Sequence, residues 1–222
     1  VAMGYQAGKT DQNNHAVAIG SSAGDNDQGF AAVAMGYNAG KTGQGDEAVA
    51  IGNQAGWNDQ GVNAVAMGPG AGNNGQGEYA VAIGTAAGVL FQNKSAVAMG
   101  YQAGYNNQGE KAIAIGDSAG NIGQVLDAIA IGTAAGQTGQ GEKAVAMGYQ
   151  AGKTDQNNHA VAIGSSAGDN DQGFAAVAMG YDAGKTGQGD NAVAIGREAG
   201  QGQGEKAVAM GYQAGQTGQG EK

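Results

Sequence analysis

The sequence contains no cysteine and a single proline in 222 residues. Disulfide bridges, thiolate zinc sites and cysteine nucleophiles are therefore excluded. Aromatic residues are scarce as well, with eight tyrosines, three phenylalanines and one tryptophan. Because the remaining apolar residues are mostly Ala, Val, Met and Ile, we do not expect a thick core of large side chains.

Basic residues and long apolar runs are also rare. The net charge is −9, and an acidic chain is repelled by phosphate backbones and anionic lipid headgroups, so we expect no nucleic-acid partner. No stretch approaches the roughly 18 consecutive apolar residues that a membrane span requires. We therefore expect no membrane insertion by this segment.

Glycine, in contrast, is abundant, with 46 residues, and it occupies fixed places in a repeat. The pentapeptide Ala-Val-Ala-Met/Ile-Gly, in which Ile sometimes replaces Val, recurs every 16 residues, as from Ala16 to Ala32. The unit that begins at Ala192 is one residue short. A short and regular period of this kind is typical of a solenoid, in which each coil packs on its neighbours.

The local pattern within each unit predicts strands. Small and large side chains alternate with period two in Ala-Val-Ala-Ile-Gly. Glycines at positions 5 and 9 of every unit, such as Gly20 and Gly24, leave no room for a helix. We therefore predict an all-β fold in which residues 1–222 form a single domain. This domain is a parallel β-solenoid of about fourteen 16-residue coils.

A third glycine position, position 14, has a different pattern of substitution. It is usually Gly, but Asn13, Asn93 and Asn157 replace it in three units and Val125 in another. Among non-glycine residues, Asn is one of the most tolerant of positive φ. The pattern therefore predicts a tight corner with positive φ at this position.

Glutamine stands at position 13 of every unit. Stacked coils place identical residues about 4.8 Å apart, close enough for side-chain amides to hydrogen-bond along the stack. We predict a structural ladder rather than a row of ligand-binding amides, because a surface site does not need Gln in every coil. The ladder comprises Gln12, Gln28, Gln44, Gln60, Gln76, Gln92, Gln108, Gln124, Gln140, Gln156, Gln172, Gln188, Gln203 and Gln219.

The first strand of each unit is apolar on both faces. Val or Ile at position 2 and Met or Ile at position 4 project to one face, and Ala and Gly project to the other. A strand of this kind should be buried on both faces. A single solenoid buries one face and leaves the other as a long apolar stripe, larger than a soluble monomer usually exposes. We therefore expect a homo-oligomer joined along this strand, and the pattern leaves open which face lines the interface.

The "AVAIG" and "AVAMG" pentapeptides, each followed by "xxAG", resemble the head repeats of trimeric autotransporter adhesins, the YadA-like family. The resemblance covers the whole chain and extends to similar repeats in viral and phage fibre proteins. It implies a left-handed β-roll, three chains around a common axis and a place at a cell surface. The unit is longer than the usual bacterial head repeat, and these residues contain no neck, stalk or anchor, so the resemblance does not imply that family's secretion mechanism.

These observations predict an extracellular fibre segment on a cell or virion surface. We expect a trimer that mediates or extends attachment to a host surface glycan or protein. The alternative is a self-assembling extracellular filament without receptor binding, in which chains stack end to end. The chain begins and ends inside a repeat, which favours a segment of a longer array. We expect no enzyme and no cofactor, because no acid, base and nucleophile are combined around His15 or His159.

Aromatic residues are the candidates for surface contacts. Tyr follows the corner glycine in most units that carry Met. A row of such rings can stack on sugars, or each ring can cover its corner while the hydroxyl stays in water. The candidates are Tyr5, Tyr37, Trp57, Phe91, Tyr101, Tyr149, Tyr181 and Tyr212.

Two other ligands are less favoured by the sequence. "DNDQG" at 25–29 and 169–173 resembles part of a calcium loop but lacks the full ligand set, so we expect no metal. An ice-binding solenoid requires a regular threonine array, and Thr at position 11 is interrupted by Asn, Leu and Ile. The threonines at this position are Thr10, Thr42, Thr138, Thr154, Thr186 and Thr217.

Overall fold

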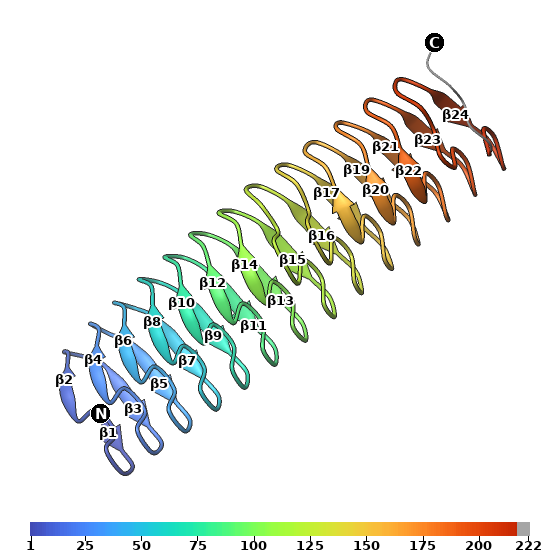
Figure 1. The fold of residues 1–222 in the computed structure, drawn as a ribbon. Coiled ribbons are helices and arrows are strands. Elements are labelled where there is room, and N and C mark those ends of the chain that lie inside the picture. The colour runs from blue at the N-terminus through green and yellow to red at the C-terminus, as the bar shows by residue number, and fades with distance from the viewer. Residues whose placement is uncertain (217–222) are drawn as a thin grey trace. The chain divides into compact units, whose positions relative to one another are not determined.

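The computed structural model describes residues 1–216, which form an all-β parallel β-solenoid (Figure 1). It divides into two compact units, Val1–Lys111 and Ala112–Lys222. From here on, "unit" refers to these two parts of the chain, and each sequence repeat is called a coil. In both units every strand pairs in parallel with the same strand of the next coil, so that Val17 is opposite Val33. The predicted fold class is thereby confirmed. Within residues 1–216 there is no helix that is long and apolar enough to cross a membrane.

The first unit contains two rows of short strands, one on each side of the coil. The strands of the first row form on the Ala-Val-Ala-Met/Ile-Gly segment. Each strand of the second row ends at the Gln at position 13 of its coil. The first row consists of β1 (Ala2–Met3), β3 (Val17–Ile19), β5 (Val33–Met35), β7 (Val49–Ile51), β9 (Val65–Met67), β11 (Val81–Ile83) and β13 (Val97–Met99). The second row consists of β2 (Thr10–Gln12), β4 (Asn26–Gln28), β6 (Thr42–Gln44), β8 (Asn58–Gln60), β10 (Asn74–Gln76), β12 (Leu90–Gln92) and β14 (Asn106–Gln108).

The second unit repeats this arrangement with a shorter second row. Its first row consists of β15 (Ile113–Ile115), β16 (Ile129–Ile131), β17 (Val145–Met147), β19 (Val161–Ile163), β21 (Val177–Met179), β23 (Val193–Ile195) and β24 (Val208–Met210). Its second row consists of β18 (Thr154–Gln156), β20 (Asn170–Gln172) and β22 (Thr186–Gln188). Isolated bridges join Ile122 to Thr138 and Thr138 to Thr154, so the same pairing continues in the coils that precede β18.

Alanine and glutamine fill the interior of the coils. The alanines at positions 1, 3 and 8 are buried in almost every coil, and Ala48, Ala50 and Ala55 are each 0% exposed. The largest fully buried side chains are the glutamines at position 13, such as Gln60 at 1% exposure. The Ala face of the first strand is therefore the inner face. Val, Met and Ile, which are larger, project outward.

Glycine at position 5 is required by both backbone conformation and packing. Gly36 has a φ of +133°, a region that is essentially restricted to glycine. A Cβ atom added to Gly36 would lie 2.6 Å from the backbone oxygen of Gly52 in the next coil. The corner that follows each first-row strand therefore depends on the absence of a side chain.

The prediction of positive φ at position 14 is wrong. Gly77 at this position does not have positive φ; instead, a Cβ there would lie 2.6 Å from the backbone nitrogen of Lys94. The backbone N–O distance to the next coil is 2.7 Å for Gly77, but 3.0 Å for Asn93 and 3.1 Å for Val125. Glycine at this position therefore allows close approach of two coils, and a larger residue separates them slightly.

Candidate functional site

The glutamine side chains form the predicted ladder inside the coils. Gln44 Nε2 donates to Gln60 Oε1 at 3.2 Å, and also lies 2.9 Å from Val33 O and 3.2 Å from Ala48 O. The same bond links Gln12 through Gln108 in the first unit and Gln124 through Gln203 in the second. Gln219 lies outside the described residues. Because these amides are buried and fully engaged, the ladder is a structural element.

The outward side chains of the first row form an apolar stripe, which we define as positions 2 and 4 of successive coils within each unit. Met67, Met99 and Met147 at position 4 are 38%, 38% and 40% exposed. The Val and Ile residues at position 2 are mostly half-buried. This stripe is the outer face that the sequence pattern left undecided, and it is in contact with water in the isolated chain.

The predicted tyrosines lie at position 6, next to the corner glycine. In the second unit Tyr149, Tyr181 and Tyr212 occupy alternate coils and are 54%, 52% and 66% exposed. In the first unit Tyr5 and Tyr37 are 75% and 54% exposed. At least half of each tyrosine is therefore open to solvent and able to contact a partner.

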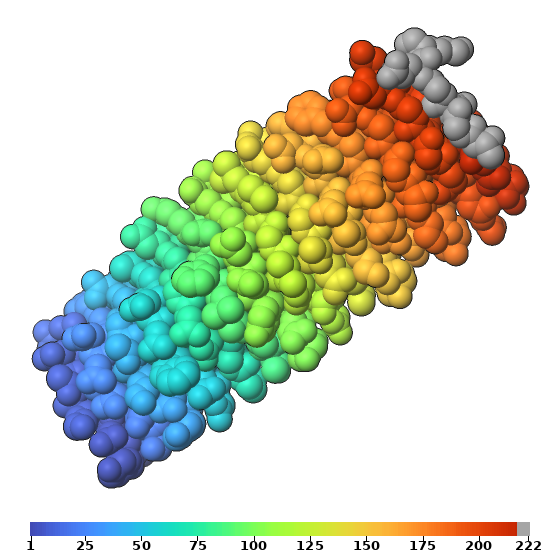
Figure 2. All heavy atoms as spheres, viewed as in Figure 1, coloured from blue at the N-terminus to red at the C-terminus, as the bar shows by residue number. Residues whose placement is uncertain are grey.

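Tyr101 is also at position 6 and is 51% exposed, whereas Trp57 and Phe91 lie elsewhere on the coil. Lys41 Nζ lies 5.9 Å from the centroid of the Trp57 ring, in a cation–π contact. Phe91 is 63% exposed and has a φ of +55°, a left-handed conformation that is unusual for a bulky residue. These side chains are therefore not part of one continuous site. On the face shown in Figure 2 neither unit has a deep hollow.

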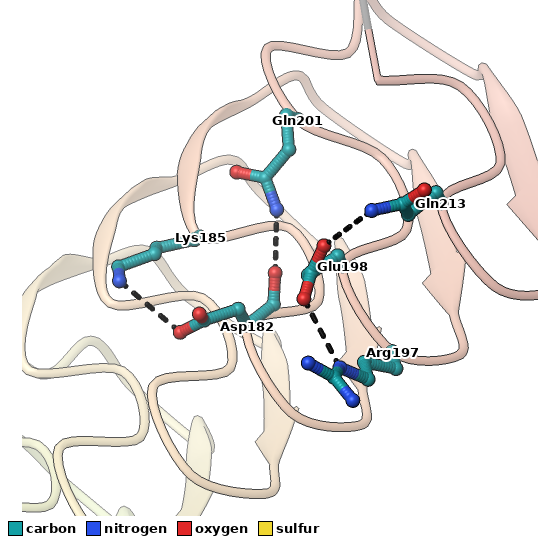
Figure 3. Close-up of polar contacts among 6 residues, drawn as sticks. All are labelled: Asp182, Lys185, Arg197, Glu198, Gln201 and Gln213. Carbon is teal, nitrogen blue, oxygen red and sulfur yellow. Dashed lines mark hydrogen bonds and ion pairs between the residues drawn. The ribbon is translucent and has the colours of Figure 1, made fainter.

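A polar cluster surrounds the shortened coil in the second unit (Figure 3). Arg197 Nε donates to Glu198 Oε1 at 3.0 Å, and Gln213 Nε2 donates to Glu198 Oε2 at 2.8 Å. These two hydrogen bonds lower the pKa of Glu198. The pKa of Arg197 is raised, first by its hydrogen bond to Glu198 and then by the charge of that carboxylate. Sequence reasoning missed this cluster, although its signal was present, since Arg197 is the one arginine in the sequence.

The same cluster extends to the preceding coil. Asp182 Oδ1 pairs with Lys185 Nζ at 3.1 Å, and Gln201 Nε2 donates to the backbone oxygen of Asp182. The Gln201 hydrogen bond connects the shortened coil to a coil of ordinary length, within which Asp182 and Lys185 pair with each other (Figure 3). Gln201 therefore attaches the shortened coil to its neighbour close to the place where one residue is missing.

Each of the two "DNDQG" segments contains an aspartate with a buried side-chain oxygen, Asp25 or Asp169. Asp25 is 7% exposed, and the Oδ1 atoms of Asp25 and Asp169 have no hydrogen-bond partner. Burial raises the pKa of Asp169, and the charges of Lys153 and Lys185 oppose this shift. Among residues 1–216 there is no group of three or more acidic or histidine side chains that could hold a metal ion.

Replacing Asp169 with Asn is expected to stabilise the protein at neutral pH. The pKa of Asp169 is higher in the folded chain than the usual value. The contribution of Asp169 to the stability of the wild-type protein is therefore most favourable below the unfolded pKa, and it is lost as the pH rises through the folded pKa. The stability of D169N relative to wild type should therefore increase from about pH 3 to about pH 7. Urea denaturation measures this difference. D171N, a change at an exposed position of the same coil, should show a smaller dependence, and equal slopes would contradict the prediction.

The two histidines make aromatic contacts with the following coil. The His15 ring lies edge-on to Phe30 at 5.4 Å, and the His159 ring lies in the same way to Phe174 at 5.5 Å. Both pairs belong to segments of identical sequence, residues 1–37 and 145–181. Their side chains therefore act as part of the coil packing at this corner.

Comparison of the chain with protein-family models, with curated proteins and with solved structures found no match. The resemblance to YadA-like head repeats therefore remains a prediction from the repeat pattern.

Proposed function

We propose that this chain is a fibre segment that assembles laterally with copies of itself, as a trimer, on a cell or virion surface, where it mediates or extends attachment. The observation that carries the proposal is the apolar stripe. Its side chains face outward, although they are the larger aliphatic residues of the repeat, while Ala and Gln fill the interior. Such a distribution is expected where a second surface covers the stripe.

The energetics favour coverage of this stripe by a large surface. Full burial of one Val, Ile or Met side chain contributes about 1.5–3 kcal/mol relative to full exposure. Met99 is 38% exposed, so one residue gains only a fraction of this amount. The gain recurs in every coil, however, and a copy of the same chain has the same repeat along its length. A sister solenoid can therefore cover the stripe coil by coil.

The second row of strands is suited to face water in such an assembly. Its strands have sequences such as Thr-Asp-Gln and Asn-Asp-Gln, in which only Gln is buried. Asp155 and Asp171, at the outward position of β18 and β20, are exposed. The number of three chains is taken from the resemblance to the YadA-like family. An assembly with the first rows inside and the second rows outside is consistent with both features.

Replacing Val97 with Asp is expected to convert the oligomer to monomers at micromolar concentration. The charge would be placed in the covered stripe, where an unpaired ion is strongly unfavourable. Native mass spectrometry and sedimentation velocity measure the change. N107D is the matched control, since it places a charge on the opposite side of the same coil, at an exposed position where other coils have Asp. It should leave the oligomer intact.

The outcomes separate the proposal from its alternatives. Circular dichroism shows whether V97D has folded, and M99E, at a more exposed position of the same strand, provides a second variant if it has not. A discrete wild-type trimer supports the proposal. Open-ended wild-type polymers support a structural filament instead, and a stable wild-type monomer contradicts lateral assembly.

A further inference from the structure

The side chain of Arg197 lies between two tyrosines of neighbouring coils. Its guanidinium carbon is 5.6 Å from the centroid of the Tyr181 ring and 5.7 Å from that of the Tyr212 ring. All three residues are at position 6, in consecutive coils. The backbone confirms this stacking, because Glu198 N donates to Tyr181 O and Gln213 N donates to Arg197 O. The chain therefore contains a space between two tyrosine rings, two coils apart, that is filled by a planar cation.

Two other pairs of tyrosines have the same spacing, with a serine at position 6 of the coil between them. Ser165 lies between Tyr149 and Tyr181 in the second unit, and Ser21 lies between Tyr5 and Tyr37 in the first. Hydrogen bonds from the backbone nitrogens of the following position-7 residues to Tyr149 O and Ser165 O show that these are again consecutive coils. We call each space between two such tyrosines a tyrosine slot.

The two serine-containing slots have the same coil spacing as the filled one. Coils are about 4.8 Å apart, so tyrosines in alternate coils are separated by about 9.6 Å in all three slots. A serine side chain ends at Oγ and is too short to lie between two aromatic rings. The slots at Ser21 and Ser165 therefore have tyrosines at the coil spacing of the filled slot, with no guanidinium from their own coil between them.

We propose that these two slots bind arginine side chains of a basic protein partner. The intramolecular occupant indicates the ligand chemistry, since Arg197 makes cation–π contacts with both rings of its own slot. A planar guanidinium stacks on aromatic faces better than a compact ammonium does. The serine hydroxyl can accept a hydrogen bond from one of the five guanidinium donors. The inference rests on the attachment role in the proposed function, but not on lateral assembly.

Electrostatics favours the same partner. The net charge of −9 attracts basic molecules and increases their rate of association. Asp182 follows Tyr181 at position 7 of the same coil, but its carboxylate is paired with Lys185 Nζ at 3.1 Å, so the attraction comes from the net charge of the chain. A single slot is expected to bind weakly, because it is exposed. A partner that presents several arginines to several slots would gain affinity through avidity.

The test is an NMR titration of the full chain with ring-labelled tyrosine, with N-acetylarginine amide as the probe. Tyr149 should show a saturable chemical-shift change. Tyr212 should show little change, because Arg197 already fills its slot, and Tyr101, which has no tyrosine two coils before it, should also show little. N-acetyllysine amide has the same charge and should shift Tyr149 at least several-fold less.

Two reciprocal variants test the slot itself. S165R should fill the second-unit slot from within and abolish the response of Tyr149, whereas R197S should open the third slot and make Tyr212 respond. Tyr5 and Tyr37, which form the first-unit slot, should respond unchanged in both variants, and circular dichroism shows whether the second unit remains folded. An equal response of Tyr149 and Tyr101, or of Tyr149 to the arginine and lysine probes, would overturn the proposal.

Other outcomes distinguish this inference from the proposed function. A stronger response of Tyr149 to a neutral oligosaccharide such as cellohexaose would overturn arginine binding in favour of glycan binding. If native mass spectrometry finds only monomers and Tyr149 still responds to arginine, lateral assembly fails and arginine binding stands. If the trimer forms and its tyrosines do not respond, the slots are covered and arginine binding fails.

Discussion

Replacing Gly180 with Ala is expected to destabilise the second unit far more than replacing Gly187 in the same coil. Gly180 has a φ of +130°, and an added Cβ would lie 2.6 Å from the backbone oxygen of Gly196. A non-glycine residue in such a conformation costs about 1–3 kcal/mol, and the clash with backbone cannot be relieved by a side-chain rotation. The total loss should therefore be about 4 kcal/mol or more.

Gly187 is the matched control for this substitution. It has a φ of +58°, and an added Cβ would have nothing within 4 Å. G187A should therefore cost only the left-handed conformation of an alanine, about 1–2 kcal/mol. Urea denaturation gives the difference in the free energy of unfolding, and hydrogen exchange shows whether the loss is concentrated in the coils next to Gly180. Equal destabilisation by the two variants would mean that contact between position-5 corners does not limit stability.

The repeat predicted the fold because a solenoid converts sequence spacing directly into spatial contact. Residues 16 apart, such as Gln44 and Gln60, are neighbours in the structure. The period therefore fixed the strand pairing, and the constant glutamine fixed the ladder. The alternation of small and large residues was sufficient to predict a strand, since glycines interrupt every coil before a helix could form.

Which face of the first strand points into the coil could not be predicted, because both faces are apolar. The structure places Ala50 inside, and its neighbour Val49 is half-buried on the outer side. Alanine keeps the two strand rows close enough for Gln60 Nε2 to reach the backbone oxygen of Val49 at 2.8 Å. The narrow interior and the buried amide therefore depend on each other, which a count of apolar residues does not reveal.

Glycine patterns were ambiguous for a related reason. Positive φ and close backbone approach both select glycine, and the structure shows both requirements together at Gly36 but close approach alone at Gly77. Other left-handed positions were hidden because the residues vary. Gln54, Phe91 and Asn63 all have positive φ at positions where the residue type changes from coil to coil. The Arg197 cluster was missed because two of its contacts, Gln213 to Glu198 and Gln201 to Asp182, join separate coils, and the repeat does not show which variable side chains of neighbouring coils meet.

Replacing Gln172 with Glu is expected to make the stability of the second unit strongly dependent on pH. Gln172 is 0% exposed, and its Nε2 lies 2.8 Å from Val161 O, 3.2 Å from Ala176 O and 3.2 Å from Gln188 Oε1. A carboxylate in this place would face three oxygen acceptors without a proton to donate. Burial and these acceptors both raise the pKa of the introduced carboxyl.

The sign of the effect follows from the raised pKa. The folded state then binds a proton more tightly than the unfolded state, so the variant is most stable below the unfolded pKa and loses stability as the pH rises through the folded pKa. With an unfolded pKa of about 4.3, Q172E should lose about 3–4 kcal/mol between about pH 4 and pH 7. Q172L lacks the carboxyl and also leaves its partners unpaired, so it should be destabilised at every pH by a similar amount. Parallel pH profiles of the two variants would show that water reaches the ladder, and the buried amides would then contribute much less to holding the coils together.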